Sequence, residues 1–187
     1  MKKLSILITT LWKRRPELNE LLKVLEPQKT DDVEIIINTD NGSKSVGHKR
    51  NELLNAAQGD YICFVDDDDM IVSDYIEKIL KAIETNPDVV GIEGIFTNKG
   101  QDPHRFIHSI KYHEWFESGG IYYRCPNHWN PVKREFALLT MFPDVYCGED
   151  RDYSMRLFPL LKSEVFIQGA IYFYQFDADK TEAQKKR

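Results

Sequence analysis

The chain has 187 residues, 42% of them hydrophobic and 12% aromatic, which indicates one folded globular domain rather than a disordered protein. The formal net charge of −5 argues against a protein that depends on broad attraction to a phosphate backbone, while leaving room for a local basic groove. The three cysteines lack paired spacing, and the first apolar run is too short for a transmembrane helix. We therefore expect a cytoplasmic protein without a transmembrane segment.

Strand and helix patterns alternate through the first hundred residues. Short runs rich in β-branched and aromatic residues predict strands over 4–10, 32–39, 61–65 and 88–96. Apolar residues at helical spacing predict three helices, which begin at Pro16, at about Val46 and after the expected cap Ser73. The short connections predict an α/β fold with a mostly parallel central sheet and helices on both faces.

The second half of the chain is less regular. We expect a strand over 121–124, helices that begin near 132 and 148, terminal β structure over 165–174, and a charged tail. The spacings of His104, His108 and His113 could place some of these rings on one helical face. Because no cysteine or carboxylate accompanies them, a zinc site is not the expected use of these histidines.

Four consecutive carboxylates, Asp66 to Asp69, follow the predicted strand over 61–65. Open α/β sheets bind their ligands at the carboxyl ends of the strands. Adjacent carboxylates repel one another by roughly 1 kcal/mol or more per close pair, so a cation is expected beside them. Hard oxygen ligands without a nearby cysteine or histidine favour Mg²⁺ or Mn²⁺, whereas the spacing does not fit an EF-hand. The alternative is a solvated acidic loop that opens the next helix.

Three further places carry unusual polar groups. Asp40 ends the second predicted strand and so brings another carboxylate to a strand end. Arg50 falls among apolar positions of its helix, where a charge needs either a protein acid or a ligand oxygen as its partner. Glu149 and Asp150 precede Arg151 at a predicted helix start, although acids also favour any helix N-terminus. The chain has neither a G-x-G-x-x-G sequence nor a Walker lysine loop, so those phosphate cradles are not supported.

The order of these strands, turns and acidic motifs along the chain resembles that of glycosyltransferase family 2, whose members have the Rossmann-like GT-A fold. The resemblance runs from about Leu4 to Leu161. It rests on the strand ending at Thr9-Thr10, the turn Asp40-Asn41-Gly42-Ser43, Lys49-Arg50-Asn51, Gly59-Asp60-Tyr61, Phe64 to Asp69, and Gly148-Glu149-Asp150. It implies a nucleotide-sugar-binding half over about 1–100, an acceptor-binding half over about 101–175 and a tail over 176–187.

The resemblance also implies donor-binding roles, residue by residue. Thr9 would lie by the nucleotide, where the family more often has a Pro-Thr pair. Asp40 would bind the uracil or the ribose, although the common double acid is replaced here by Asp-Asn. Arg50 would contact the base or the phosphates. Asp66 would meet the ribose or the metal shell, and Asp67 would add negative charge beside the donor.

The metal expected from the resemblance is Mg²⁺ or Mn²⁺. Asp68 would bind it directly. His128 lies where some GT-A enzymes place a further metal ligand or an acceptor contact. Trp129 would either stack on an acceptor sugar or base, or pack in the core.

The implied reaction is metal-dependent, inverting transfer of a sugar from a nucleotide-diphospho-sugar, expected to be UDP-linked, to an acceptor hydroxyl. The metal would neutralise the leaving diphosphate, and Asp150 would be the general base, with Glu149 and Arg151 positioning it. The acceptor stays open among a glycan, a lipid carrier, a protein, a small molecule and a modified nucleic-acid base, and so does the oligomeric state. One alternative is a metal-dependent nucleotidyltransferase, although the basic loop over 9–15 has no glycine. The other alternative is a non-catalytic nucleotide-binding module of the same fold.

Overall fold

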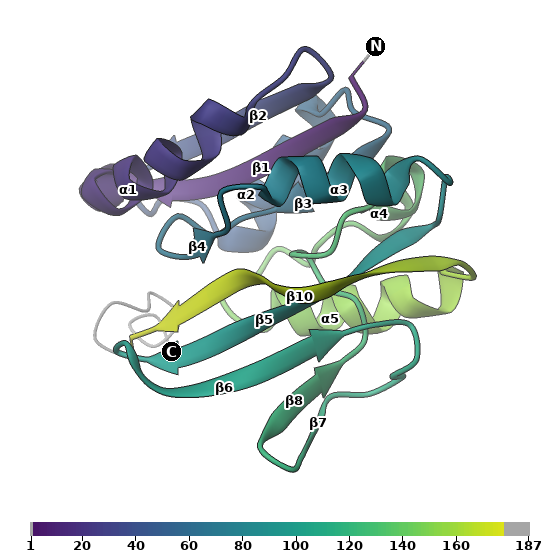
Figure 1. Ribbon diagram of the computed structural model, residues 1–187. Helices are drawn as coiled ribbons and strands as arrows, with labels where there is room; N and C mark the ends of the chain where they lie inside the picture. The colour runs from purple at the N-terminus through teal and green to yellow at the C-terminus, as the bar shows by residue number, and fades with distance from the viewer. Residues whose placement is uncertain (1, 178–187) are drawn as a thin grey trace.

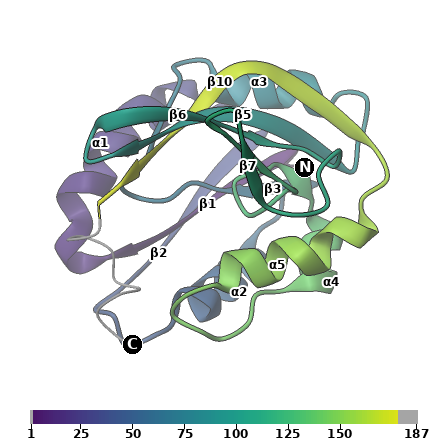
Figure 2. The same ribbon diagram turned by 90° about the horizontal axis from the view of Figure 1, so that it is seen from below.

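Figures 1 and 2 show the protein as a computed structural model that describes residues 2–177. The described residues build one 10-stranded sheet with helices packed against it. The charged tail expected over 176–187 lies, from residue 178 onward, outside the described residues. Among the described helices, none is long and apolar enough to cross a membrane.

The observed elements reproduce the strands and helices predicted for the first half, with small shifts at their ends. The strands are β1 Leu4–Leu11, β2 Val33–Asp40, β3 Tyr61–Phe64, β4 Met70–Ile71, β5 Val89–Asn98, β6 Gln101–His108, β7 Phe116–Ser118, β8 Ile121–Arg124, β9 Val132–Lys133 and β10 Glu164–Phe176. The helices are α1 Arg15–Leu25, α2 Val46–Ala56, α3 Tyr75–Ile83, α4 Arg134–Thr140 and α5 Glu149–Leu157. Short 3-10 segments follow β1, α1 and α5 at Trp12–Arg14, Glu26–Gln28 and Phe158–Leu160.

Parallel pairing joins the long strands of the first half and recurs in the second half of the sheet. Strands β2, β1 and β3 lie side by side and parallel, and the pairs β5–β10 and β6–β8 are also parallel. The two-residue strand β9 lies antiparallel between β3 and β5, so β3 and β5 run in the same direction. The strands of the first half therefore end at one edge of the sheet. The prediction of a mostly parallel sheet is confirmed, with antiparallel pairs added by β4, β6, β7 and β9.

Two hydrophobic cores explain why β1 is buried on both faces. Successive side chains of a strand point to opposite faces of the sheet. Ile6 and Ile8 join a core with residues of α1 and α3, whereas Leu7 joins a second core with residues of α2, α4 and α5. Figure 2 shows these two sets of helices on opposite sides of the sheet. Because both faces are covered, β1 cannot alternate polar with apolar residues as a half-exposed strand does.

The segment that carries the histidines is a hairpin rather than a helix. Lys99 and Gly100 have positive φ angles of 50° and 75° and form the turn between β5 and β6. His104 and His108 therefore lie on strand β6, and His113 lies in the connection after it. The helical alternative for this segment was wrong because residues four apart share one face in a strand as well as in a helix.

Smaller differences concern caps and short strands. The N-cap of α3 is Asp74 instead of Ser73, and Asp74 makes no side-chain cap hydrogen bond. Strands β4, β7 and β9 have only two or three residues each. Such short runs carry no periodic pattern, and their pairing is set by the sheet around them.

Candidate active site

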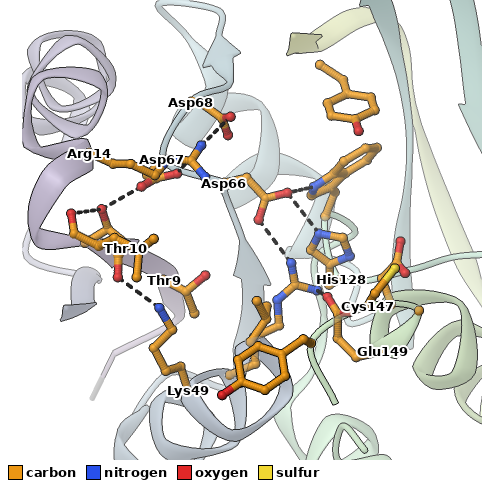
Figure 3. Close-up of a pocket in the computed structure, with 18 of the residues that line it drawn as sticks. Thr9, Thr10, Arg14, Lys49, Asp66, Asp67, Asp68, His128, Cys147 and Glu149 are labelled. Atoms are coloured by element: carbon orange, nitrogen blue, oxygen red, sulfur yellow. Dashed lines mark hydrogen bonds and ion pairs between the residues drawn. The ribbon is translucent and has the colours of Figure 1, made fainter. Parts of the chain in front are cut away.

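A pocket of ≈ 410 Å³ opens at the carboxyl ends of β1 and β3, where the sequence predicts ligand binding. Figure 3 shows the side chains that line it. They come from segments far apart in the chain, including Thr9 to Leu11, Arg14, Lys49 and Arg50, Asp66 to Asp68, Trp115, Arg124, His128 and Trp129, Cys147 to Asp150, and Tyr174 to Asp177. The fold thus gathers most of the predicted site residues in one place.

Asp67 joins the acidic run to the end of β1. Thr10 Oγ1 donates a hydrogen bond of 2.6 Å to Asp67 Oδ2, and Arg14 Nη2 lies 2.9 Å from Asp67 Oδ1. The same Nη2 atom contacts Asp68 Oδ2. One guanidinium therefore bridges two neighbouring carboxylates at the floor of the pocket.

Asp66 is held by three side chains from other elements. Arg50 Nη2 lies 3.1 Å from Asp66 Oδ1, while Trp129 Nε1 donates a 3.0 Å hydrogen bond to Oδ2 and His128 Nε2 lies 3.3 Å from the same oxygen. Burial alone raises the pKa of Asp66, but the neighbouring His128 ring, the Arg50 guanidinium and the hydrogen bonds outweigh it. They hold that pKa well below its usual range, so Asp66 stays ionised.

Asp67 and Asp68 share one guanidinium, that of Arg14, which does not offset the effect of their burial. Burial raises the pKa of Asp67 to about 7, against the opposing effects of Arg14 and Thr10. Burial also raises the pKa of Asp68, with a further contribution from the charge of Asp66. Both carboxylates line the pocket, so a ligand that brings more positive charge is favoured there.

Asp69 serves the fold rather than the pocket. Asp69 is 1% exposed. Tyr172 Oη donates a 2.7 Å hydrogen bond to its Oδ2, and the backbone N–H of Gln175 donates one of 2.9 Å to its Oδ1. Burial and the neighbouring carboxylates raise the pKa of Asp69 well above its ordinary value. The last acid of the run therefore ties the acidic loop to β10.

Arg50 takes protein acids as its partners, one of the two options left open by its sequence position. It is 4% exposed, and its Nη1 lies 3.2 Å from Glu149 Oε1 while its Nη2 reaches Asp66. Its guanidinium also lies 5.5 Å from the ring centre of Phe64 and 5.4 Å from that of Phe142. Arg50 thus connects the acidic run to the start of α5. Its contact with a donor base or phosphate stays a prediction.

The start of α5 places two acids differently. Gly148 has a φ of 81°, a left-handed conformation that suits glycine, and it turns the chain into the helix. Both acids line the pocket, but Glu149 is buried and pairs with Arg50, whereas Asp150 is half-buried. Arg151 is exposed and, within the described residues, is not among those that line the pocket.

Arg124 of β8 and Arg50 both interact electrostatically with Asp150. The Arg124 guanidinium lies 4.4 Å from the ring centre of Trp115, and both residues line the pocket. Burial lowers the pKa of Arg124, and the charge of Asp150 opposes that shift. Since Arg151 is exposed, Arg124 and Arg50 are better candidates than Arg151 to influence Asp150 electrostatically.

Asp40 lies beside the pocket and holds one of its lining residues. Its Oδ1 accepts a 2.9 Å hydrogen bond from Lys49 Nζ, and its Oδ2 accepts one of 2.9 Å from the Lys44 amide. Lys49 also donates to the Thr10 carbonyl at 2.9 Å. Burial raises the pKa of Asp40, but these hydrogen bonds outweigh it and lower the value to about 2. Lys49 therefore lines the pocket with an ammonium group that is held in place by Asp40 and the Thr10 carbonyl.

Nine of the predicted site residues line this pocket. They are Thr9, Arg50, Asp66, Asp67, Asp68, His128, Trp129, Glu149 and Asp150. The residues that sequence reasoning missed include Thr10, Arg14, Lys49, Arg124 and Cys147. Arg14 belongs to the basic loop over 9–15, and Lys49 belongs to the Lys49-Arg50-Asn51 segment of the resemblance. The second half of the chain has no pattern that would single out Arg124 or Cys147.

The carboxylates of the pocket fit a divalent cation that is also coordinated by a substrate. Asp66, Asp67 and Asp68 supply hard carboxylate oxygens, and burial leaves the last two short of positive charge. Among the described residues, however, no group of three or more His, Cys, Asp or Glu side chains is arranged to hold a metal ion. Mg²⁺ characteristically binds one or two protein carboxylates together with substrate phosphates, so this arrangement suits a metal completed by a diphosphate.

Comparisons with known proteins agree with this geometry. The family model described as glycosyl transferase family 2 matches residues 15–139. No curated protein matches the chain. Among solved structures, S. aureus TarS has a TM-score of 0.70 and 16% identity, covering 93% of this chain and 37% of TarS.

Two further TarS structures are similar. TarS 1-349 in complex with UDP-GlcNAc has a TM-score of 0.72 and 17% identity over 99% of this chain and 61% of that one. TarS 1-349 in complex with UDP has a TM-score of 0.71 and 18% identity over 93% of this chain and 60% of that one. The chain thus spans less than two thirds of the length of these TarS chains, and the likeness establishes the GT-A fold.

Proposed function

This chain belongs to glycosyl transferase family 2, and on that premise we propose that it transfers a sugar from a nucleotide-diphospho-sugar to an acceptor hydroxyl. The observation that carries the proposal is a single pocket that holds the carboxylates of Asp66 to Asp68 together with that of Asp150. S. aureus TarS was solved with UDP and with UDP-GlcNAc, so UDP-GlcNAc is the first donor to test.

Basic side chains in the first half of the chain suit the diphosphate of such a donor. Lys49 is fixed by Asp40 and by the Thr10 carbonyl, and Arg14 lies beside Asp67 and Asp68. Fixed positive charge next to the diphosphate stabilises the nucleoside diphosphate as it leaves. In this proposal Asp40 acts by positioning Lys49, while Thr9 lines the pocket beside the nucleotide.

The proposal includes Mg²⁺ or Mn²⁺, with Asp68 as the direct ligand and His128 as the candidate for a further one. When bound, a divalent cation supplies Lewis-acid stabilisation of the leaving diphosphate. Asp68 suits this role because its side chain is 28% exposed and lines the pocket, whereas Asp66 already has three side-chain partners. His128 Nε2 faces Asp66, so His128 can also act by orienting that carboxylate.

Asp150 is proposed as the general base. It lines the same pocket as the acidic run but comes from the start of α5, so the base and the donor site belong to different elements. A base that accepts the proton of an acceptor hydroxyl on the side away from the leaving diphosphate gives inversion at the anomeric carbon. Glu149 supports this geometry through its ion pair with Arg50.

The acceptor-binding half assigned to 101–175 contributes Trp115, Arg124 and Trp129 to the pocket. The Trp115 ring and the Arg124 cation can contact an acceptor, whereas Trp129 is 4% exposed and packs in the core. The acceptor class, the assignment of the two halves and the cytoplasmic location stay predictions.

Turnover of UDP-GlcNAc tests the proposal. We expect release of UDP by the wild-type protein, loss of transfer with unchanged UDP binding for Asp150→Asn, and normal turnover for Asp152→Asn. Asp152 is the matched control because it lies two residues further along α5, 48% exposed and paired with Arg156. Normal turnover by Asp150→Asn would refute the assignment of the base. Release of pyrophosphate from a nucleoside triphosphate would instead indicate a nucleotidyltransferase.

A further inference from the structure

We propose that the Arg14 guanidinium and the divalent cation compete for Asp68, so that the metal binds strongly only together with a nucleoside diphosphate. This inference rests on the proposed function and deepens it by naming the residue that couples metal binding to donor binding. Its starting point is the bridge that Arg14 makes across the two acids at the floor of the pocket.

The bridge consists of two ion-pair contacts made by one nitrogen atom of Arg14. Arg14 ends the 3-10 segment after β1, and its Nη2 lies 2.9 Å from Asp67 Oδ1 while also contacting Asp68 Oδ2. Figure 3 shows the guanidinium of Arg14 reaching the carboxylates of both residues. The side chains of Arg14 and Asp67 are 19% and 4% exposed, and that of Asp68 is 28% exposed. Asp68 is therefore the acid of the pair that a cation from solvent can reach.

The other acids of the run are fixed by additional partners. Asp67 also accepts a hydrogen bond from Thr10, and Asp69 is held by Tyr172 and Gln175. For Asp68, the described residues offer one ion pair, the contact with Arg14. Asp68 is thus the acid whose carboxylate can change partner with the least cost to the rest of the site.

Electrostatic repulsion disfavours simultaneous contact of the Arg14 guanidinium and a divalent cation with Asp68. A guanidinium and a divalent cation on the same carboxylate repel each other, since like charges a few ångströms apart interact strongly at a partly buried site. A metal that arrives alone must therefore displace Arg14 from Asp68. A diphosphate changes the balance, because its oxygens complete the metal coordination and accept hydrogen bonds from the displaced guanidinium in a bidentate arrangement.

The sequence next to Arg14 offers a matched control. Arg15 is the adjacent residue and has the same charge, but it is exposed and does not line the pocket within the described part of the chain. Replacing Arg15 changes the net charge of the protein by the same amount as replacing Arg14. Any difference between the two variants therefore reports on the position of Arg14 rather than on overall charge.

The experiment is measurement of Mn²⁺ binding by electron paramagnetic resonance, with and without saturating UDP, for the wild type and for Arg14→Ala, Arg14→Lys and Arg15→Ala. Without UDP, we expect Arg14→Ala to bind Mn²⁺ about tenfold more tightly than the wild type, which corresponds to the loss of one charge-assisted contact. The Mn²⁺ affinity of Arg14→Lys should fall between these two, because lysine keeps the positive charge but lacks the guanidinium group. Arg15→Ala should match the wild type. UDP should tighten Mn²⁺ binding more in the wild type than in Arg14→Ala.

Several outcomes would overturn the inference. Unchanged or weaker Mn²⁺ binding by Arg14→Ala, or an equal effect of Arg15→Ala, would show that Arg14 does not compete with the metal. Binding of UDP without any Mn²⁺ binding would do the same. Failure of the wild type to bind UDP under any condition would instead count against the proposed function, so the two failures are distinguishable. Arg14→Lys keeps the test decisive if Arg14→Ala does not fold.

Discussion

Replacing Arg50 with methionine removes the charge that holds Asp66 and Glu149 together. The Arg50 side chain is 5% exposed, and its two partners are 25% and 9% exposed. Breaking a buried pair by deleting one partner costs about 3–5 kcal/mol, because it leaves a buried charge without compensation. For a domain of this size each kcal/mol lowers Tm by roughly 2–4 °C, so we expect a fall of roughly 6–20 °C.

Urea denaturation provides the assay and a double-mutant cycle provides the control. Arg50→Met, Glu149→Gln and the double variant should show coupling, since removing both charges leaves fewer uncompensated groups than the two single changes predict, by about 0.5–3 kcal/mol. Lys23→Ala is the reference for an exposed pair. Lys23 is 68% exposed beside Glu20, which is 64% exposed, and its loss should cost no more than about 1 kcal/mol. Equal denaturation midpoints for Arg50→Met and Lys23→Ala would refute the argument.

Two further predictions concern the elements that frame the pocket. The pKa of Asp40 is lowered to about 2 from an ordinary 3.8, so its contribution to stability is complete above about pH 4 and is lost as the pH falls toward 2. Asp40→Asn should flatten the dependence of Tm on pH within that window, and an unchanged slope would contradict the assignment. A Cβ on Gly47 would lie 1.8 Å from the Pro143 carbonyl oxygen, so Gly47→Ala should destabilise the protein by about 1–3 kcal/mol in urea denaturation. Asn55→Ala, at an exposed position of the same helix, should change stability by no more than about 0.5 kcal/mol, and equal effects of the two would rule out the clash.

The alternating strands and helices of the first half were predictable from the sequence because each element is long enough to show a period. Strand β1 and helix α1 illustrate this, since the strand is buried on both faces and the helix shows its apolar stripe at Leu18, Leu21 and Leu25. Strand β6 could not be separated from a helix, because the four-residue spacing of His104 and His108 fits both. The two-residue strands β4 and β9 depend on their neighbours in the sheet.

The site was predictable as a set of acids but not as a set of contacts. Asp66 to Asp69 look equivalent in the sequence, yet Asp66 and Asp69 point to different partners from the second half of the chain, Trp129 and Tyr172. The need of Arg50 for a partner followed from its apolar helix face, whereas the identity of its partners, Asp66 and Glu149, depends on contacts across the fold. Tertiary contacts of this kind leave no local pattern.

Calorimetric titration with UDP, with and without Mn²⁺, on the wild type and on Asp68→Asn tests the central claim most directly. GDP titrated under the same conditions tests whether the site prefers uracil to guanine as the nucleobase. The account predicts UDP binding that Mn²⁺ strengthens in the wild type, and loss of that Mn²⁺ effect in Asp68→Asn. Absence of UDP and GDP binding under every metal condition would contradict a nucleotide-sugar site, and an undiminished Mn²⁺ effect in Asp68→Asn would contradict the role given to Asp68.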